Sequence, residues 1–416
     1  MRVGVIGGGP AGATVSLLLA RSGVDVTLFD KAVFPRDKAC GDVVGPRAVR
    51  VLSEIGVGLP DERWPVGEMQ LSWRSLTMTL PSRGGIGFDG TGYSIKRQIF
   101  DDYLLRRSLQ EGTQLVTGRV SFVGERGQGA ELICEGQRCS FDIIVGADGA
   151  NSVTAKTAGL VDEDRVEMGF ALRRYLDGHV AMPRIDMLAP ESMGGLLGYG
   201  WTFPNSGGVN AGVGVAVGQN RSRARGLHGH LDRYVAKLEH LLSTEAIGCD
   251  AGGWLKMGMI GTLPARGRVL LVGDAAGLVN PFQGEGIAAA IESGRFAAEA
   301  IMTAKAGAAI AYRRRLYDES LAFQSTGHLL LRVARQRTDL AGSALRGLVT
   351  LGRRHCGIAA GWGLFWNDLT AQSGPVPGGG VARGLALAGT LATRCDPIGR
   401  RYRASEWTRV PGIAGG

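Results

Sequence analysis

The segment RVGVIGGGPAGA, Arg2–Ala13, sets the plan of the whole chain. A short apolar run leads directly into Gly7, Gly9 and Gly12, which are spaced as G-x-G-x-x-G, and a Leu- and Ala-rich segment follows. A strand, a glycine turn and a helix in that order are typical of a dinucleotide site, where the pyrophosphate lies at the helix N-terminus. Asp30 ends a second predicted strand, at the offset of an acid that binds a ribose hydroxyl. The alternative is a glycine-rich turn in an ordinary βαβ unit.

The composition is that of a globular chain with a basic surplus. The chain has 416 residues, of which 44% are hydrophobic and 20% charged, and its formal net charge is +9. From Arg332 onward, twelve arginines stand against four acids. This surplus predicts either a solvated basic surface or one that meets anionic lipid or an acidic partner. No nucleic-acid partner is predicted, because no helix-turn-helix, zinc or RNP-type motif accompanies the charge.

Cysteine usage and hydropathy predict a cytoplasmic protein with free thiols and no metal site. Neither a signal peptide nor an apolar run of roughly 20 residues that would span a bilayer is recognisable. The cysteines lack the paired spacing of a metal or disulfide framework. They are Cys40, Cys134, Cys139, Cys249, Cys356 and Cys395.

A cluster of aromatic and basic residues near the C-terminus predicts peripheral contact with a membrane. Trp362, Phe365 and Trp366 follow Arg353 and Arg354, and aromatics beside basic residues are typical of a helix at a membrane interface. The alternatives are that these aromatics close a substrate tunnel or belong to the core.

Two further apolar runs each end in a glycine and an acid. In FDIIVGADGANS, residues 141–152, the turn is expected to expose the Asp148 carboxylate beside backbone that a ligand can approach closely. The alternative is a plain surface turn.

The second of these runs is VLLVGDAAGLVN, residues 269–280, which contains Asp274. Gly284 and Gly286 then lead into a long predicted helix that begins at Ile287. The N-terminus of that helix would stabilise negative charge near the turn.

Alternating apolar and polar residues predict a second, mostly antiparallel sheet. Its strands fall within residues 64–80 and 167–217, and the later region carries Tyr199, Trp201 and Phe203. These aromatics are either core residues or the wall of an apolar pocket. Other predicted elements are helices over 47–55, 99–111, 227–242 and 287–304, strands over 116–123 and 130–139, and a linker over 373–380.

The three turns GGGPAG, GADGANS and VGDAAG, in this order, resemble the FAD oxidoreductases of the p-hydroxybenzoate hydroxylase type. FPRDKACGD at residues 34–42, followed by PRAV, and LGYGWTFP at 197–204 further resemble the geranylgeranyl reductase family. The resemblance implies an α/β fold with three parts. A Rossmann-like FAD-binding domain is interleaved with a mostly antiparallel β-sheet substrate domain, and a helical region follows at the C-terminus.

The resemblance also implies where these parts lie along the chain. Residues 1–60, 93–160 and 262–312 are assigned to the FAD-binding domain, residues 61–92 and 161–261 to the substrate domain, and residues 313–416 to the helical, basic C-terminal region.

The same resemblance implies which residues bind FAD and substrate. Arg97 is expected at the FAD phosphate or ribitol, Asp274 at the ribitol, and Asp148 in indirect contact. Tyr199, Trp201 and Phe203 are expected to line an apolar tunnel. The full set of expected FAD-binding residues is Gly7, Gly9, Gly12, Asp30, Cys40, Gly41, Arg97, Asp148, Asp274, Gly284, Gly286 and Ile287.

Two reactions fit the expected flavin and apolar pocket. The first is reduction of a C=C bond in an isoprenoid or prenylated substrate by hydride from reduced FAD, with Cys40 or Tyr199 as the candidate proton donor. The second is an FAD-dependent monooxygenase that hydroxylates or epoxidises an aromatic or terpenoid intermediate. We favour the reductase, because FPRDKACGD followed by PRAV is close to menaquinone and geranylgeranyl reductases. A flavin halogenase or a non-catalytic flavoprotein fits less well.

The electron donor is expected to be NAD(P)H or another reductant that binds transiently, because no second G-x-G-x-x-G stands between a strand and a helix. The sequence does not specify the oligomeric state.

Overall fold

The computed structural model describes residues 1–80, 91–238, 245–355 and 358. Its central element is a six-stranded sheet, parallel apart from one edge hairpin. The strands are β1 Arg2–Ile6, β2 Asp25–Asp30, β8 Gln114–Thr117, β12 Ile143–Gly146, β18 Ala265–Arg266 and β19 Val269–Leu271. Their order across the sheet is β18-β19-β12-β1-β2-β8, so the three glycine-acid turns, which follow β1, β12 and β19, lie side by side at one edge.

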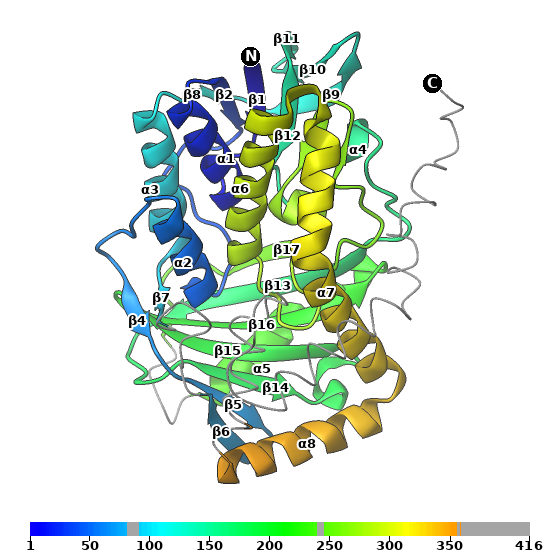
Figure 1. Ribbon diagram of the computed structural model, residues 1–416. Helices are drawn as coiled ribbons and strands as arrows, with labels where there is room; N and C mark the ends of the chain where they lie inside the picture. The colour runs from blue at the N-terminus through cyan, green and yellow to red at the C-terminus, as the bar shows by residue number, and fades with distance from the viewer. Residues whose placement is uncertain (81–90, 239–244, 356–357, 359–416) are drawn as a thin grey trace.

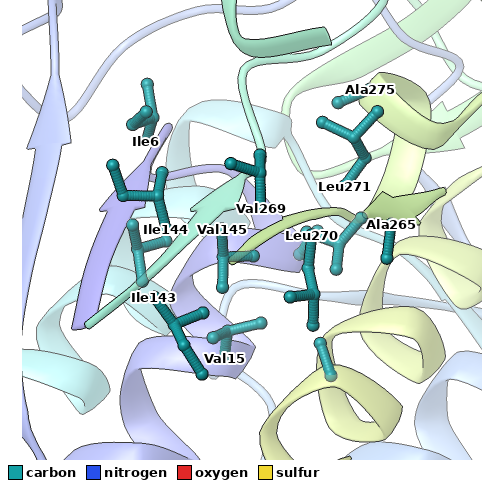
Figure 2. Packing of buried hydrophobic residues seen from close by; sticks show 14 of the residues in the cluster. Ile6, Val15, Ile143, Ile144, Val145, Ala265, Val269, Leu270, Leu271 and Ala275 are labelled. Carbon is teal, nitrogen blue, oxygen red and sulfur yellow. The ribbon is translucent and has the colours of Figure 1, made fainter. Parts of the chain in front are cut away.

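The parallel sheet has the main apolar core of the molecule around it. Its strands read as continuous apolar runs because both faces are covered, and Figure 2 shows the packing of Ile6, Ile144, Val145 and Leu270 within this core. The helices that cover it include α1 Pro10–Arg21, α3 Arg97–Gln110 and α6 Ile287–Ala304, and α1 packs against both α3 and α6.

The second large sheet has seven strands and is antiparallel except where β5 and β14 pair. Its strands are β5 Met69–Trp73, β6 Leu76–Leu80, β13 Glu167–Leu176, β14 Arg184–Leu188, β15 Leu197–Asn205, β16 Gly208–Gly218 and β17 Ala251–Met257. Their order is β17-β13-β16-β15-β14-β5-β6. The α/β fold class with a mostly antiparallel second sheet is confirmed, whereas the exact domain boundaries stay a prediction.

The first part of the 64–80 segment departs from the predicted strand pair. Trp64–Val66 (β4) pairs with β7 (Gly92–Ser94), which also pairs with β3 (Val43–Val44), to form a small separate sheet. Only β5 and β6 join the large sheet.

Two other predicted strands are wrong in extent. Residues 116–123 are divided between β8 and β9 (Val120–Arg126), because the chain leaves the parallel sheet at Thr117. Residues 130–139 are divided between β10 (Gly129–Cys134) and β11 (Gln137–Phe141), because Glu135 and Gly136 adopt positive φ and form a turn. Together β9, β10 and β11 form a three-stranded antiparallel sheet.

The remaining helices fall in segments predicted to be helical, except the short helix over residues 153–157, which was not predicted. They are α2 Pro46–Glu54, α4 Val153–Thr157, α5 Leu227–Ala236, α7 Ala308–Gln336 and α8 Thr338–Arg354. The predicted helix over 227–242 ends at Ala236, and residues 239–244 lie outside the described residues, as do the predicted linker over 373–380 and Trp362, Phe365 and Trp366. In Figure 1, α8 lies along β5 and β6, at the opposite end of the molecule from the parallel sheet. No helix among the described residues is long and apolar enough to cross a membrane.

Candidate active site

The first glycine turn is shaped by contacts that only glycine allows. Gly7 has φ +104°, and a Cβ there would lie 2.3 Å from the carbonyl oxygen of Ala147. A Cβ at Gly12 would lie 1.8 Å from the carbonyl oxygen of Gly7. The remaining glycine of the motif, Gly9, is the N-cap residue of α1, so no side chain occupies the N–H groups at the start of this helix. The backbone N–H groups of this turn are therefore arranged to receive an anion at a helix N-terminus.

Asp30 binds the turn itself. Its Oδ2 accepts a hydrogen bond of 2.7 Å from the Gly8 N–H, and its Oδ1 accepts one of 2.8 Å from the Ala32 N–H. The acid therefore joins the end of β2 to the glycine turn. A role toward a ribose stays a prediction.

Arg36 reaches the same turn. Its Nη2 atom lies 3.6 Å from where a Cβ on Gly9 would stand. The Nη1 atom of Arg36 lies 3.0 Å from Asp101 in α3. Asp101 is fully buried and also accepts two hydrogen bonds of 2.7 Å from Arg97. A cation is thus held over the anion-binding turn.

The Asp148 side chain differs from expectation. Its carboxylate is not presented to a ligand but accepts hydrogen bonds from the Ser152 hydroxyl at 2.6 Å and from the N–H of Thr154 at 2.9 Å. These groups begin α4, whose free N–H groups attract a carboxylate. Asp148 therefore positions the turn after β12, and its indirect role toward a cofactor stays a prediction.

The third turn faces the N-terminus of α6. Asp274 lies in a short 3-10 segment after β19, and Lys38 approaches its carboxylate to 3.9 Å. Behind the turn, the Nζ of buried Lys256 donates a hydrogen bond of 3.1 Å to the Ala275 carbonyl. Burial lowers the pKa of Lys256 to about 8. Lys256 holds the turn on the side away from the cavity that is described below. The Asp274 carboxylate lines that cavity.

The loop that carries Cys40 is fastened by a buried network. Asp42 is fully buried and has φ 65°. Its Oδ2 accepts hydrogen bonds from the Tyr175 hydroxyl at 2.6 Å and from Asn210 Nδ2 at 2.8 Å. Burial raises the pKa of Asp42 to about 6, against the effect of those hydrogen bonds, which lower it. Asn210 also donates to the Cys40 carbonyl at 2.8 Å, so the loop is bound to the second sheet.

The predicted aromatic residues pack against this loop. Trp201 Nε1 donates a hydrogen bond of 2.9 Å to Asn210 Oδ1. A Cβ at Gly41 would lie 3.0 Å from the Phe203 ring and 3.4 Å from Trp201 Nε1. Gly41 therefore allows the loop to approach both rings closely.

A cavity of about 200 Å³ lies between the parallel sheet and the second sheet. It brings together ten residues predicted to bind FAD or substrate, which are Cys40, Gly41, Arg97, Tyr199, Trp201, Phe203, Asp274, Gly284, Gly286 and Ile287. Pro10, next to Gly9, lines its other end. Gly7, Gly9, Gly12, Asp30 and Asp148, which were also predicted to bind FAD, do not line this cavity.

A second, larger cavity of about 400 Å³ lies between the second sheet and the helices α7 and α8. Its wall is almost entirely apolar and includes Trp73, Met187, Leu331, Leu345 and Leu348. Sequence reasoning missed the helical side of this cavity, because a long-range approach of α7 and α8 creates it.

The two cavities share part of their walls. The residues that line both are Ala171, Tyr199, Leu255 and Gly284. The Tyr199 hydroxyl donates a hydrogen bond to the Gln283 carbonyl. A Cβ at Gly284, which has φ +74°, would lie 2.7 Å from that hydroxyl oxygen. Tyr199 and the turn before α6 therefore form the boundary between a glycine-lined cavity that contains charged residues such as Arg97 and Asp274 and an almost entirely apolar one.

Sequence reasoning also missed Arg36, Tyr175 and Asn210 as functional residues. Arg36 belongs to the same FPRDKACGD segment as Cys40, so its place in that motif could have marked it as a functional residue. Tyr175 and Asn210 lie on β13 and β16 in ordinary strand patterns and gave none.

The glycine turn, the cation above it and the adjoining cavity fit a flavin dinucleotide, and they define a flavoprotein of the oxidoreductase class. A family profile described as "FAD binding domain" matches residues 1–62. Menaquinone reductase of Mycolicibacterium smegmatis is 33% identical over 318 residues, which are 71% of this chain and 75% of that protein. Digeranylgeranylglycerophospholipid reductase 1 of Methanopyrus kandleri is 31% identical over 316 residues, which are 72% of this chain and 80% of that protein.

A solved structure supports the fold. A geranylgeranyl bacteriochlorophyll reductase-like protein from Thermoplasma acidophilum matches with a TM-score of 0.68 and 21% identity, over 88% of this chain and 96% of that chain. The chain belongs to the geranylgeranyl reductase family of FAD-dependent oxidoreductases.

Proposed function

We propose that this enzyme reduces a C=C bond in the prenyl chain of an apolar substrate. The observation that carries the proposal is the shared wall at Tyr199 and Gly284, where the apolar cavity meets the cavity assigned to the flavin ring. The apolar cavity has a volume within the roughly 300–1,000 Å³ typical of small-molecule sites. A prenyl chain lying in it would end against the flavin.

When bound, FAD in its reduced form supplies a hydride to one alkene carbon. The residues that would hold FAD are Gly7, Gly9 and Gly12 of the glycine turn and Arg36 at the pyrophosphate, and Asp274 at the ribitol. The N-terminus of α6 would lie near the ring, where the N–H groups favour the negative charge of a reduced flavin.

The second alkene carbon needs a proton. Tyr199 directs its hydroxyl hydrogen to the Gln283 carbonyl, and burial raises the pKa of this phenol. Burial also raises the pKa of the Cys40 thiol, but the neighbouring Arg97 guanidinium lowers it. Arg97 would stabilise the thiolate that remains after proton transfer. Cys40 is therefore the proposed proton donor, Tyr199 is the proposed positioning residue, and solvent returns the proton to Cys40.

The electron donor is proposed to be NAD(P)H or another reductant that binds only transiently. Relatives of this chain are named as reductases of menaquinone, of geranylgeranyl diphosphate and of digeranylgeranylglycerophospholipid. The proposed substrate class here is what these share, namely a prenyl chain attached to a polar head.

Product mass tests this proposal. The FAD-loaded protein is chemically reduced and incubated without O₂, in turn with a prenylated quinone and with a prenyl diphosphate. A product that has gained two hydrogens supports the proposal. A product that has gained one oxygen, and only in air, would replace it with a monooxygenase.

A further inference from the structure

We infer that the outer face of α8, with the adjoining end of α7, docks on an anionic lipid surface and receives the substrate there. The inference rests on the proposed function, because it concerns how a prenyl chain reaches the apolar cavity.

Large apolar side chains are exposed on these two helices. Leu329 and Val333 of α7 are 37% and 45% exposed, and Leu340 and Leu351 of α8 are 49% and 48% exposed. Leu340 and Leu351 are eleven residues apart, which is about three helical turns, so they lie on the same face of α8. The opposite face is packed on β5 and β6, where Val349 is fully buried. A large part of each outer apolar side chain is therefore left uncovered by the described residues.

Basic residues accompany these side chains. α8 contains Arg346, Arg353 and Arg354 but only one acid, Asp339. Arg346, Arg353 and Arg354 are exposed. An amphipathic helix with exposed leucines on its outer face and exposed arginines along its length matches a membrane interface, where apolar groups enter the acyl boundary and long basic side chains reach anionic headgroups. This charge favours an anionic membrane over a neutral one.

The surface adjoins the apolar cavity. Val333 and Ala344 both line that cavity and are exposed to solvent. They mark its opening between α7 and α8, next to Leu340. In Figure 1, α8 crosses the end of the molecule farthest from the parallel sheet. A prenyl chain could pass from the lipid into the cavity while its reactive bond moves toward Tyr199.

The test is flotation of the full-length, FAD-loaded protein with vesicles. Wild type should bind phosphatidylglycerol vesicles at low salt, bind phosphatidylcholine vesicles weakly, and be released from the anionic vesicles by high salt. The double variant Arg353→Glu/Arg354→Glu should lower the apparent affinity at least about tenfold, since each basic residue near such a surface contributes about a fivefold factor. Leu340→Ser/Leu351→Ser should also weaken binding.

The matched control is Arg223→Glu/Arg225→Glu. Arg223 lies in a 3-10 segment outside both helices and Arg225 follows directly after it; both are exposed, and the double change alters the net charge by the same amount. The control should bind vesicles like wild type. FAD content and melting temperature confirm that each variant is folded. The inference would be overturned if the control lost as much vesicle binding as Arg353→Glu/Arg354→Glu, or if neither α8 variant lost any.

Activity separates this inference from the proposed function. The α8 variants should reduce a short, detergent-solubilised prenyl substrate like wild type and lose turnover only when the substrate is embedded in vesicles. Wild-type protein that reduces the solubilised substrate but does not bind anionic vesicles would overturn the docking surface alone. Protein that binds the vesicles as described but reduces neither substrate would leave the docking surface supported and contradict the proposed function.

Discussion

The hydroxyl of Tyr199 donates a hydrogen bond to the backbone carbonyl of Gln283. Tyr199 belongs to β15 of the antiparallel sheet, whereas Gln283 lies in the turn that leads into α6 of the nucleotide domain. This contact joins the two halves of the site at the point where both cavities meet. In the proposed function, Tyr199 therefore helps to position the substrate relative to the flavin ring.

Replacing Cys40, the proposed proton donor, and Tyr199, the proposed positioning residue, should lower turnover to different extents. Tyr199→Phe removes one hydrogen bond, worth about 1 kcal/mol, and should lower turnover about fivefold to tenfold with FAD retained. Cys40→Ala should lower turnover by about 10² or more, because it removes the proton source. Single-turnover rates with a prenyl substrate measure the effect of each variant, and the flavin content shows whether FAD is retained.

Cys249→Ala is the control, since Cys249 is an exposed free thiol. Its rate should equal that of wild type. If Tyr199→Phe is slowed far more than Cys40→Ala, the roles assigned to these residues are reversed.

Gly12→Val should release FAD and destabilise the fold. A Cβ at this position would lie 1.8 Å from the Gly7 carbonyl oxygen, so the turn must move. Overpacking of this kind costs about 1–3 kcal/mol or more. Gly67→Val is the control, because Gly67 is exposed and has no atom within 4 Å of a Cβ. The melting temperature and the bound flavin should be unchanged in the control. Full flavin retention in Gly12→Val would contradict the assignment of this turn to FAD binding.

The first glycine turn and much of the fold could be predicted from sequence because their determinants are local. Gly7, Gly12 and Asp30 follow one another along a strand, a turn and a helix, and their spacing alone fixes their proximity. The Asp148 side chain could not be placed in the same way, because the α4 N-terminus competes for its carboxylate.

The buried network and the larger cavity depend on contacts far apart in the chain. Asp42, Tyr175 and Asn210 come from a loop and two strands, and no local pattern marks them as partners. The apolar cavity exists only where α7 and α8 meet the second sheet. Leu345 and Leu348 look like ordinary core residues in sequence, although they line that cavity.

Asp42→Asn should stabilise the protein more at neutral than at acidic pH. In the folded state the pKa of Asp42 is about 6, above its ordinary value of 3.8. Between these values the unfolded chain releases a proton that the folded chain keeps, so the stability from this group is full below pH 3.8 and is lost as pH rises through about 6. The difference between the two pKa values corresponds to about 3 kcal/mol of unfolding free energy.

Denaturant unfolding at pH 5 and pH 7.5 measures this difference. The benefit of Asp42→Asn should be larger at pH 7.5, while Asp61→Asn, at a fully exposed carboxylate, should change neither curve. An equal benefit at both pH values would mean that Asp42 is ionised throughout this range.

Gly342→Leu should shorten the prenyl chain that the enzyme accepts. Gly342 lines the apolar cavity, and a Cβ there would lie 3.4 Å from the Trp73 ring. Gly347→Leu is the matched control on the same helix, where a Cβ would meet nothing within 4 Å. Both changes improve helix propensity alike. The kcat/KM for a long chain should fall at least about tenfold in Gly342→Leu only, with a short-chain substrate little affected. Equal values for both variants would place the substrate elsewhere.

The central claim is that the alkene of a prenyl chain lies against the flavin at the shared wall of the two cavities. The most direct test mixes reduced, FAD-loaded protein with a prenyl substrate in the absence of O₂ and follows the visible absorbance band of oxidised flavin. The band should return as one alkene is reduced per flavin, and more slowly in Tyr199→Phe. A flavin that stays reduced with every prenyl substrate, and is oxidised only when O₂ is admitted, would contradict the claim.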